Sequence, residues 1–141
     1  HDMPPAAGYL EYGHVKLREQ LGLLSGPVEE FQKSATAEHN AMLNMLVEEG
    51  YLDKAALDDE AANENEIVDA LYRGLKGSPC KLMAASIVDA VGEKRTQNQP
   101  GTNNEYPNWR IPLADGEGNV VPLEKLFDEP RLQEITAIMR G

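Results

Sequence analysis

Residues 80–91, CKLMAASIVDAV, form the most apolar run of the chain, and the fold class depends on how this run is interpreted. The run could be a buried strand followed by a short helix, or one buried helix, because hydrophobic periodicity does not separate the two over so few residues. Residues 81–85 are the strand candidate, and Cys80 is expected to be an inert thiol in the core. With one or two short strands at most, we predict a mainly α-helical chain.

The segments on both sides of this run favour helices. Residues 14–76 are predicted to be a helical region, in which Gly50 suits the position just after a helix end. Within it, residues 53–66 are the least apolar stretch and are expected to be a solvated connector or a first helical turn, with an acidic binding tail as the other interpretation. Residues 119–141 are predicted to end the chain as a helix that starts near Pro130. The apolar residues recur at helical spacing, as in Leu17, Leu21 and Leu24, in Met42, Met45 and Leu46, and in Leu132, Ile135 and Ile138.

Two segments are expected to be irregular. Residues 1–13 contain Pro4 and Pro5, which exclude an ordinary helix interior, yet they carry bulky apolar groups that something should cover. Residues 92–118 are loop-like and too long for an ordinary connection. Long ordered loops tend to be functional or to cover a site.

Composition limits the possible partners. The chain has 141 residues, with 24 acidic residues against 13 Lys and Arg, which suits one acidic domain and disfavours nucleic acid as a partner. No apolar run approaches the roughly 18 residues of a membrane span. The single cysteine cannot form an intrachain disulfide, so a cytoplasmic location is expected. The three His and one Cys lack zinc-site spacing, and the glycines form no phosphate-binding pattern, so neither a metal nor an organic cofactor is expected.

The chemistry that the chain could perform is concentrated in residues 97–110. Amide side chains, the Trp109 indole and the Arg110 guanidinium suit a sugar, since amides both donate to and accept from hydroxyl groups. The alternative is that Trp109 anchors the loop in the core and Arg110 pairs with an acid. At the start of the chain, the Asp2 carboxylate beside the His1 imidazole could stabilise a developing positive charge, or the pair could be a frayed terminus.

Three segments, taken together, resemble one known family. They are HDMPPAAGYL at residues 1–10, CKLMAASIVD at residues 80–89, and NQPGT at residues 98–102 followed by PNWR at residues 107–110. Their order and rough spacing are similar to the carboxy-terminal part of the amylomaltase (4-α-glucanotransferase) family, glycoside hydrolase family 77. The likeness covers essentially the whole chain, and the NxPGT…PNWR signature is its specific part.

The resemblance implies an elaborated (β/α)8 TIM barrel that transfers segments of α-1,4-glucan or maltooligosaccharide by retaining double displacement. It assigns Asp2 to the stabilisation of a cation-like transition state and His1 to sugar hydroxyls, and it places Asn98 in the glucan groove. In barrel terms, residues 1–13 are an active-site loop, residues 80–91 are the last barrel strand with the following turn, and residues 92–118 are the signature loop.

The chain departs from the family pattern because the nucleophile and the general acid/base of the family lie upstream of the His-Asp motif, and no residue here matches them. The first residue is His1 rather than Met, so we expect a carboxy-terminal piece that is inactive alone. A barrel strand without neighbours has unpaired backbone groups, and the helices that packed on the barrel have uncovered faces. The piece is therefore expected to be mainly helical and to self-associate. The competing hypothesis is a small acidic helical interaction module without catalysis.

Overall fold

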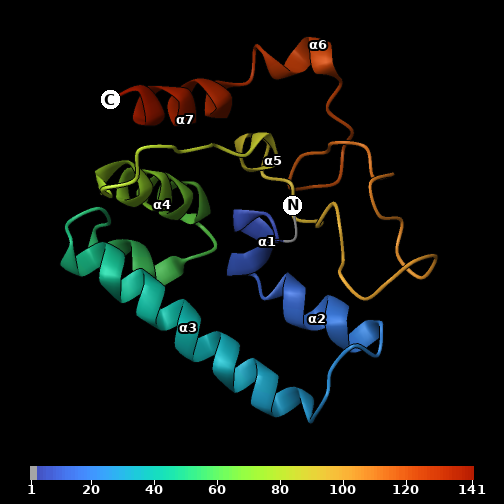
Figure 1. The fold of residues 1–141 in the computed structure, drawn as a ribbon. Helices are drawn as coiled ribbons and strands as arrows, with labels where there is room; N and C mark the ends of the chain where they lie inside the picture. The colour runs from blue at the N-terminus through green and yellow to red at the C-terminus, as the bar shows by residue number, and fades with distance from the viewer. Residues whose placement is uncertain (1–2) are drawn as a thin grey trace.

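The computed structural model describes residues 3–141 and consists of helices joined by loops (Figure 1). In chain order these are α1 (Ala6–Leu10), α2 (Gly13–Gln20), α3 (Val28–Glu48), the 3-10 helix η1 (Lys54–Asp59), α4 (Glu64–Gly77), α5 (Ile87–Ala90), α6 (Leu123–Leu126) and α7 (Pro130–Arg140). Within residues 3–141 the extended backbone pairs only at one isolated antiparallel bridge, between Ala114 and Val120. The prediction of a mainly α-helical chain is confirmed.

Local sequence signals explain where α3 ends and where α7 begins. The backbone of α3 ends in a left-handed residue, Gly50, with φ 78°. The Gly50 amide donates to the Val47 carbonyl at 3.1 Å, and the Tyr51 amide donates to the Leu46 carbonyl at 2.8 Å. This is the hydrogen-bond pattern of a Schellman motif, as Gly50 predicts. At the other end of the chain, Pro130 occupies the first turn of α7, as expected, although α6 is a separate helix within the predicted terminal segment.

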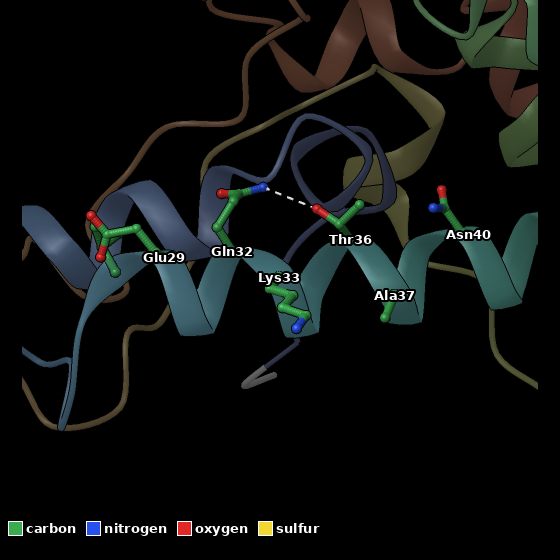
Figure 2. A pocket seen from close by; sticks show the side chains of 7 residues that line it. Glu29, Gln32, Lys33, Thr36, Ala37 and Asn40 are labelled. Atoms are coloured by element: carbon green, nitrogen blue, oxygen red, sulfur yellow. Dashed lines mark hydrogen bonds between the residues drawn. The ribbon is translucent and has the colours of Figure 1, made fainter.

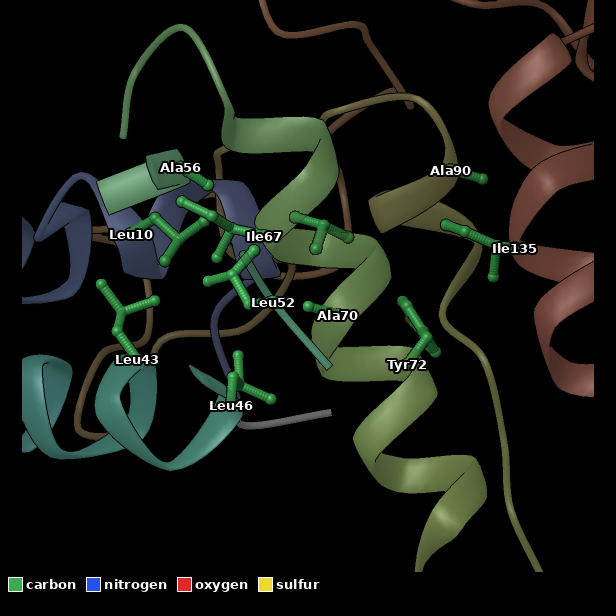
Figure 3. Close-up of a cluster of buried hydrophobic side chains, with 11 residues drawn as sticks. Leu10, Leu43, Leu46, Leu52, Ala56, Ile67, Ala70, Tyr72, Ala90 and Ile135 are labelled. Carbon is green, nitrogen blue, oxygen red and sulfur yellow. The ribbon is translucent and has the colours of Figure 1, made fainter. Parts of the chain in front are cut away.

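The main core forms where α4 packs between α3 and α7 (Figure 1). Figure 3 shows its apolar side chains converging on α4 from α1, α3, η1, α5 and α7. The cluster contains Leu10, Leu43, Leu46, Leu52, Ala56, Ile67, Val68, Ala70, Tyr72, Ala90 and Ile135. Each fully buried large aliphatic side chain contributes about 1.5–3 kcal/mol, so this cluster holds the helices together.

Residues 80–91, the most apolar run of the sequence, contain no strand. Residues 81–85 have no regular secondary structure, and the Leu82 side chain is 93% exposed. The short helix that follows is present as α5. Cys80 is exposed, so the expectation of a core thiol is wrong. A strand needs backbone partners on a neighbouring strand, and within residues 3–141 none lies beside this segment.

Residues 3–13, expected to be irregular, contain the one-turn helix α1, which one carboxylate fixes in place. Asp89 Oδ1 accepts from the Ala6 amide at 2.8 Å, and Asp89 Oδ2 accepts from the Tyr72 hydroxyl at 2.6 Å. The Tyr72 oxygen also accepts from the Ser86 amide at 3.0 Å. Asp89 therefore ties the start of α1 to α4 and to the segment before α5.

The helices of residues 3–141 include none that is both long enough and apolar enough to cross a lipid bilayer.

Candidate functional site

The NQPGT part of the signature is a tight turn. Thr102 donates to the Gln99 carbonyl from its amide at 3.3 Å and from its hydroxyl at 2.6 Å. Between them, Pro100 is followed by Gly101 with φ 86°. A proline at the second position and a glycine with positive φ at the third position are typical of a type II turn. The motif therefore encodes a backbone shape as well as side chains.

The Asn108 side chain joins the two halves of the signature. Its Oδ1 accepts from the Gln99 amide at 2.7 Å, and its Nδ2 donates to the Thr102 hydroxyl at 2.8 Å. One amide thus satisfies groups on both sides of the turn, which is why PNWR accompanies NQPGT in space. The Trp109 amide adds a backbone hydrogen bond to the Gln97 carbonyl at 2.8 Å.

Tyr106 closes the loop from its far side. Its hydroxyl donates to the Thr96 carbonyl at 2.6 Å, and the Thr96 hydroxyl donates to the Asn98 carbonyl at 2.9 Å. Burial raises the pKa of the Tyr106 hydroxyl, with the positive charge of Arg95 acting in the opposite direction. Tyr106 therefore stays protonated and keeps donating at neutral pH.

A buried carboxylate lies at the base of this loop. Glu93 is 1% exposed and accepts from the amides of Arg95 and Ala114 at 2.9 and 3.0 Å. The Arg95 guanidinium donates to it twice, at 2.9 and 2.7 Å. Burial raises the pKa of Glu93, but the hydrogen bonds from Arg95 and Ala114 outweigh burial, so the pKa lies below its ordinary value.

The loop and α2 enclose a pocket of about 510 Å³. Figure 1 shows the yellow-to-orange trace of the loop running beside α2. The walls come from both regions that the resemblance singled out, namely the segment after the His-Asp pair and the signature loop. The lining residues are Pro4, Gly13, His14, Leu17, Arg18, Lys94, Arg95, Thr96, Gln99, Pro100, Tyr106, Pro107 and Ile111.

The pocket suits a neutral ligand with both apolar and polar faces. Leu17, Pro107 and Ile111 are among the apolar lining residues. Two of the cations in the walls already have partners: Arg95 pairs with Glu93, and Lys94 pairs with Glu11 and, at 3.7 Å, with Glu64. Paired cations offer little net charge to an anion, whereas their remaining N–H groups can still donate to hydroxyl groups.

His14 supplies a further polar group in the wall. Burial lowers its pKa, the Glu38 carboxylate opposes this, and Arg18 adds to the lowering. The His14 ring stacks on Tyr9 with ring centroids 5.0 Å apart, and its buried Nδ1 has no hydrogen-bond partner within residues 3–141. A neutral imidazole at this place can donate to or accept from a hydroxyl group.

A second hollow, of about 660 Å³, lies along α3 (Figure 2). All its lining residues come from that one helix, including Gln32 and Thr36, whose side chains hydrogen-bond to each other at 3.4 Å. It has no opposing wall and does not approach the signature loop, so the pocket beside α2 is the better candidate.

The structure describes only some of the site residues that the sequence predicts. Asp2 and His1 lie outside the described residues 3–141. Asn98 is half-buried in the signature loop next to the pocket residue Gln99. The Trp109 side chain is 62% exposed, so it does not anchor the loop in the core. Arg110 is exposed, and within residues 3–141 it forms no ion pair with an acid.

Sequence reasoning missed Glu93 as a site residue. Four of the five N–H groups it accepts belong to its neighbours Lys94 and Arg95. The fifth, from the Ala114 amide, depends on loop closure, which no local pattern encodes. The available signal was the Glu93-Lys94-Arg95 sequence, since a glutamate two residues before an arginine at the start of a long loop can pair with it.

Known proteins resemble this chain over nearly all of its length. A family model described as 4-alpha-glucanotransferase matches residues 1–116. A 4-alpha-glucanotransferase of Mycobacterium tuberculosis (strain ATCC 25618 / H37Rv) is 46% identical over 141 residues, which is 100% of this chain and 19% of the relative. One from Haemophilus influenzae (strain ATCC 51907 / DSM 11121 / KW20 / Rd) is 26% identical over 136 residues, which is 94% of this chain and 19% of the relative.

A solved structure agrees with these relatives. The crystal structure of amylomaltase from Corynebacterium glutamicum superposes with a TM-score of 0.86 at 35% sequence identity, covering 99% of this chain and 20% of that one. The chain thus has the fold of one segment of an amylomaltase, and it spans only 19% of the length of the relatives it matches.

Proposed function

Since the chain belongs to the 4-α-glucanotransferase family, we propose that it supplies one wall of the α-1,4-glucan groove of such an enzyme, and that the enzyme transfers glucan segments by retaining double displacement. The observation that carries the proposal is the shared pocket. Pro4 from the segment after the His-Asp pair and His14 from α2 line it together with Gln99 and Tyr106 from the signature loop. A sugar ring has apolar faces and a polar edge, which matches these walls.

In this proposal the residues of the His-Asp pair and the signature loop have separate chemical roles. Asp2 stabilises the positive charge that develops at the anomeric carbon, and His1 holds hydroxyl groups of the reacting sugar. Asn98 lines the groove at the signature loop. The nucleophile and the general acid/base belong to portions of the relatives' length that this chain does not span, so the chain alone does not turn over glucan.

Two measurements test this proposal. In a maltotriose disproportionation assay, we expect no turnover by the chain alone above the blank; clear turnover would contradict the assignment of the nucleophile and acid/base elsewhere. In a titration with maltoheptaose followed by amide chemical shifts, we expect changes at Thr96, Gln99 and Tyr106 and none along the α3 hollow. The β-1,4-linked cellotriose is the control ligand. Shifts that are absent at the loop, or equal for both sugars, would contradict glucan binding.

The role of Asp2 has its own test. In an active polypeptide that contains this segment, Asp2→Asn is expected to lower turnover by orders of magnitude while leaving the melting temperature nearly unchanged. A mild loss of rate would remove Asp2 from the mechanism.

We further propose that the isolated chain self-associates and that the protein is cytoplasmic. Leu82, Phe127 and Leu123 are 93%, 70% and 64% exposed, and apolar groups of this size favour mutual burial. The single thiol of Cys80 suits a reducing compartment, which cell fractionation can check.

A further inference from the structure

The two ends of the signature loop meet at one buried side chain. Residue 93 precedes the NQPGT…PNWR sequence and residue 114 follows it, yet Glu93 Oε2 accepts from the Ala114 amide at 3.0 Å. The same oxygen accepts from Arg95 Nη2 at 2.7 Å. The Arg95 guanidinium in turn donates to the Pro112 carbonyl at 3.0 Å. A single carboxylate and its partner arginine thus connect the entry and the exit of the loop.

The Glu93 carboxylate is almost fully removed from solvent. It is 1% exposed, so water cannot replace a lost protein partner. Its Oε1 accepts from the amides of Lys94 and Arg95 at 3.0 and 2.9 Å and from Arg95 Nε at 2.9 Å. Hydrogen bonds to a buried charge are among the stronger ones in proteins, and each of these N–H groups would lose its acceptor together with the carboxylate.

Arg95 is also a wall of the candidate pocket, together with its neighbours Lys94 and Thr96. The direction of the Arg95 side chain is set by the two parallel hydrogen bonds to Glu93 and by the bond to Pro112. Leu17 and Arg18 of α2 line the same pocket. The spacing between the loop wall and the α2 wall therefore depends on the base of the loop.

We propose that Glu93 is the positioning residue of the candidate glucan site: it closes the loop of residues 93–114 and holds Arg95 in the pocket wall, without touching the ligand itself. The glucan part of this inference rests on the proposed function, whereas the closure of the loop does not.

Amide hydrogen exchange of the ligand-free chain tests the closure. In Glu93→Gln the Ala114 amide and the hydrogen-bonded loop amides of Gln99, Thr102 and Trp109 should exchange about tenfold faster or more, because a neutral amide cannot accept the same set of charged and backbone donors. The core amides of Ile67 and Ala70 in α4 should stay within about twofold of wild type, because α4 packs on other helices. Glu124→Gln, an exposed position in α6, is the matched control and should change neither set.

A second variant separates the contact of the Glu93 carboxylate with the Arg95 guanidinium from its contact with the Ala114 amide. Arg95→Gln removes the guanidinium but leaves the Glu93 carboxylate with the Ala114 amide, so Ala114 should remain more protected than in Glu93→Gln. The Arg95 Nε–H resonance of the wild type should be shifted downfield as expected for a carboxylate-bound guanidinium, and it should lose that shift in Glu93→Gln.

The outcomes are distinguishable. Unchanged exchange at Ala114 in Glu93→Gln would overturn the positioning role, because it would mean that the Glu93 carboxylate does not protect the Ala114 amide. Equal acceleration at Ile67 and Ala114 would also overturn it, because Glu93 would then contribute only to the stability of the whole fold. Maltoheptaose titration of Glu93→Gln should show affinity reduced about fivefold or more relative to wild type. If the wild-type chain gives no shifts with maltoheptaose, the proposed function fails, while the exchange data still decide the role of Glu93.

Discussion

Gly8 of α1 lies directly against the backbone of Lys94 at the base of the signature loop. A Cβ placed on Gly8 would be 3.0 Å from the Lys94 carbonyl carbon and closer still to its oxygen. Only a residue without a side chain allows this approach. The contact seats the segment that follows the His-Asp pair on the loop that carries NQPGT, so these two regions meet through backbone atoms as well as through the Lys94–Glu11 ion pair.

Gly8→Ala should destabilise the chain by about 1–3 kcal/mol, because the added methyl group meets backbone atoms that cannot rotate away. Chemical denaturation followed by far-UV circular dichroism measures the change in the free energy of unfolding. Gly26→Ala is the matched control, since the nearest atoms to its Cβ belong to side chains at 3.8 and 3.9 Å, and it should change stability by less than about 0.5 kcal/mol. An equal effect in both variants would contradict the close approach.

Asn108→Ala should loosen the signature loop and lower stability by about 1–3 kcal/mol, because the Gln99 amide and the Thr102 hydroxyl lose the same partner. Asn104→Ala, at an exposed position of the same loop, is the control and should be nearly neutral. Denaturation gives the stability, and amide shifts of residues 96–110 report the loop. If Asn104→Ala perturbs the loop as much as Asn108→Ala does, the amide of Asn108 does not join the two halves.

Local signals predicted the helices better than they predicted the site. Gly50 and Pro130 act within a few residues of their own helix ends, so the sequence alone locates those ends. The strand expected at residues 81–85 and the burial of Cys80 depended on neighbours from elsewhere, and the described chain provides none. The signature residues Gln99 and Asn108 were recognised as a motif, but their hydrogen bond follows from loop closure, which no periodicity encodes.

The contribution of Glu93 to stability should depend on pH in a predictable direction. Its pKa in the folded chain lies below the ordinary value of 4.5, chiefly because the hydrogen bonds from Arg95 overcome burial. Between these two pKa values the unfolded chain binds more protons than the folded chain, so stability falls as the pH falls. The contribution is fully present above pH 4.5 and is lost as the pH passes through the folded pKa.

The comparison of wild type with Glu93→Gln isolates this effect. Above about pH 5 the wild type should be more stable by about 1.5–3 kcal/mol, the usual range for hydrogen bonds to a charged group, and the difference should shrink steadily below pH 4.5. Thermal unfolding at a series of pH values measures it. A difference that grows toward acid pH would mean that the carboxyl is protonated in the folded chain.

Self-association of the isolated chain is favoured by the burial of exposed apolar side chains and opposed by the repulsion between like-charged copies. Leu82 is 93% exposed on a segment without regular structure, so its burial in a dimer could contribute about 1.5–3 kcal/mol. The net charge of −11 on each copy opposes association, and salt screens that repulsion.

Sedimentation velocity over about a hundredfold range of concentration should therefore show association that strengthens with added salt. Leu82→Glu should weaken it about tenfold or more, because it removes the apolar group and adds repulsion, whereas Lys16→Glu on α2 makes the chain more negative by two charges instead of one without removing apolar surface. A greater loss in Lys16→Glu than in Leu82→Glu would show that charge alone governs the equilibrium, and a chain that stays monomeric at every concentration and salt level would mean that the exposed apolar groups drive no association.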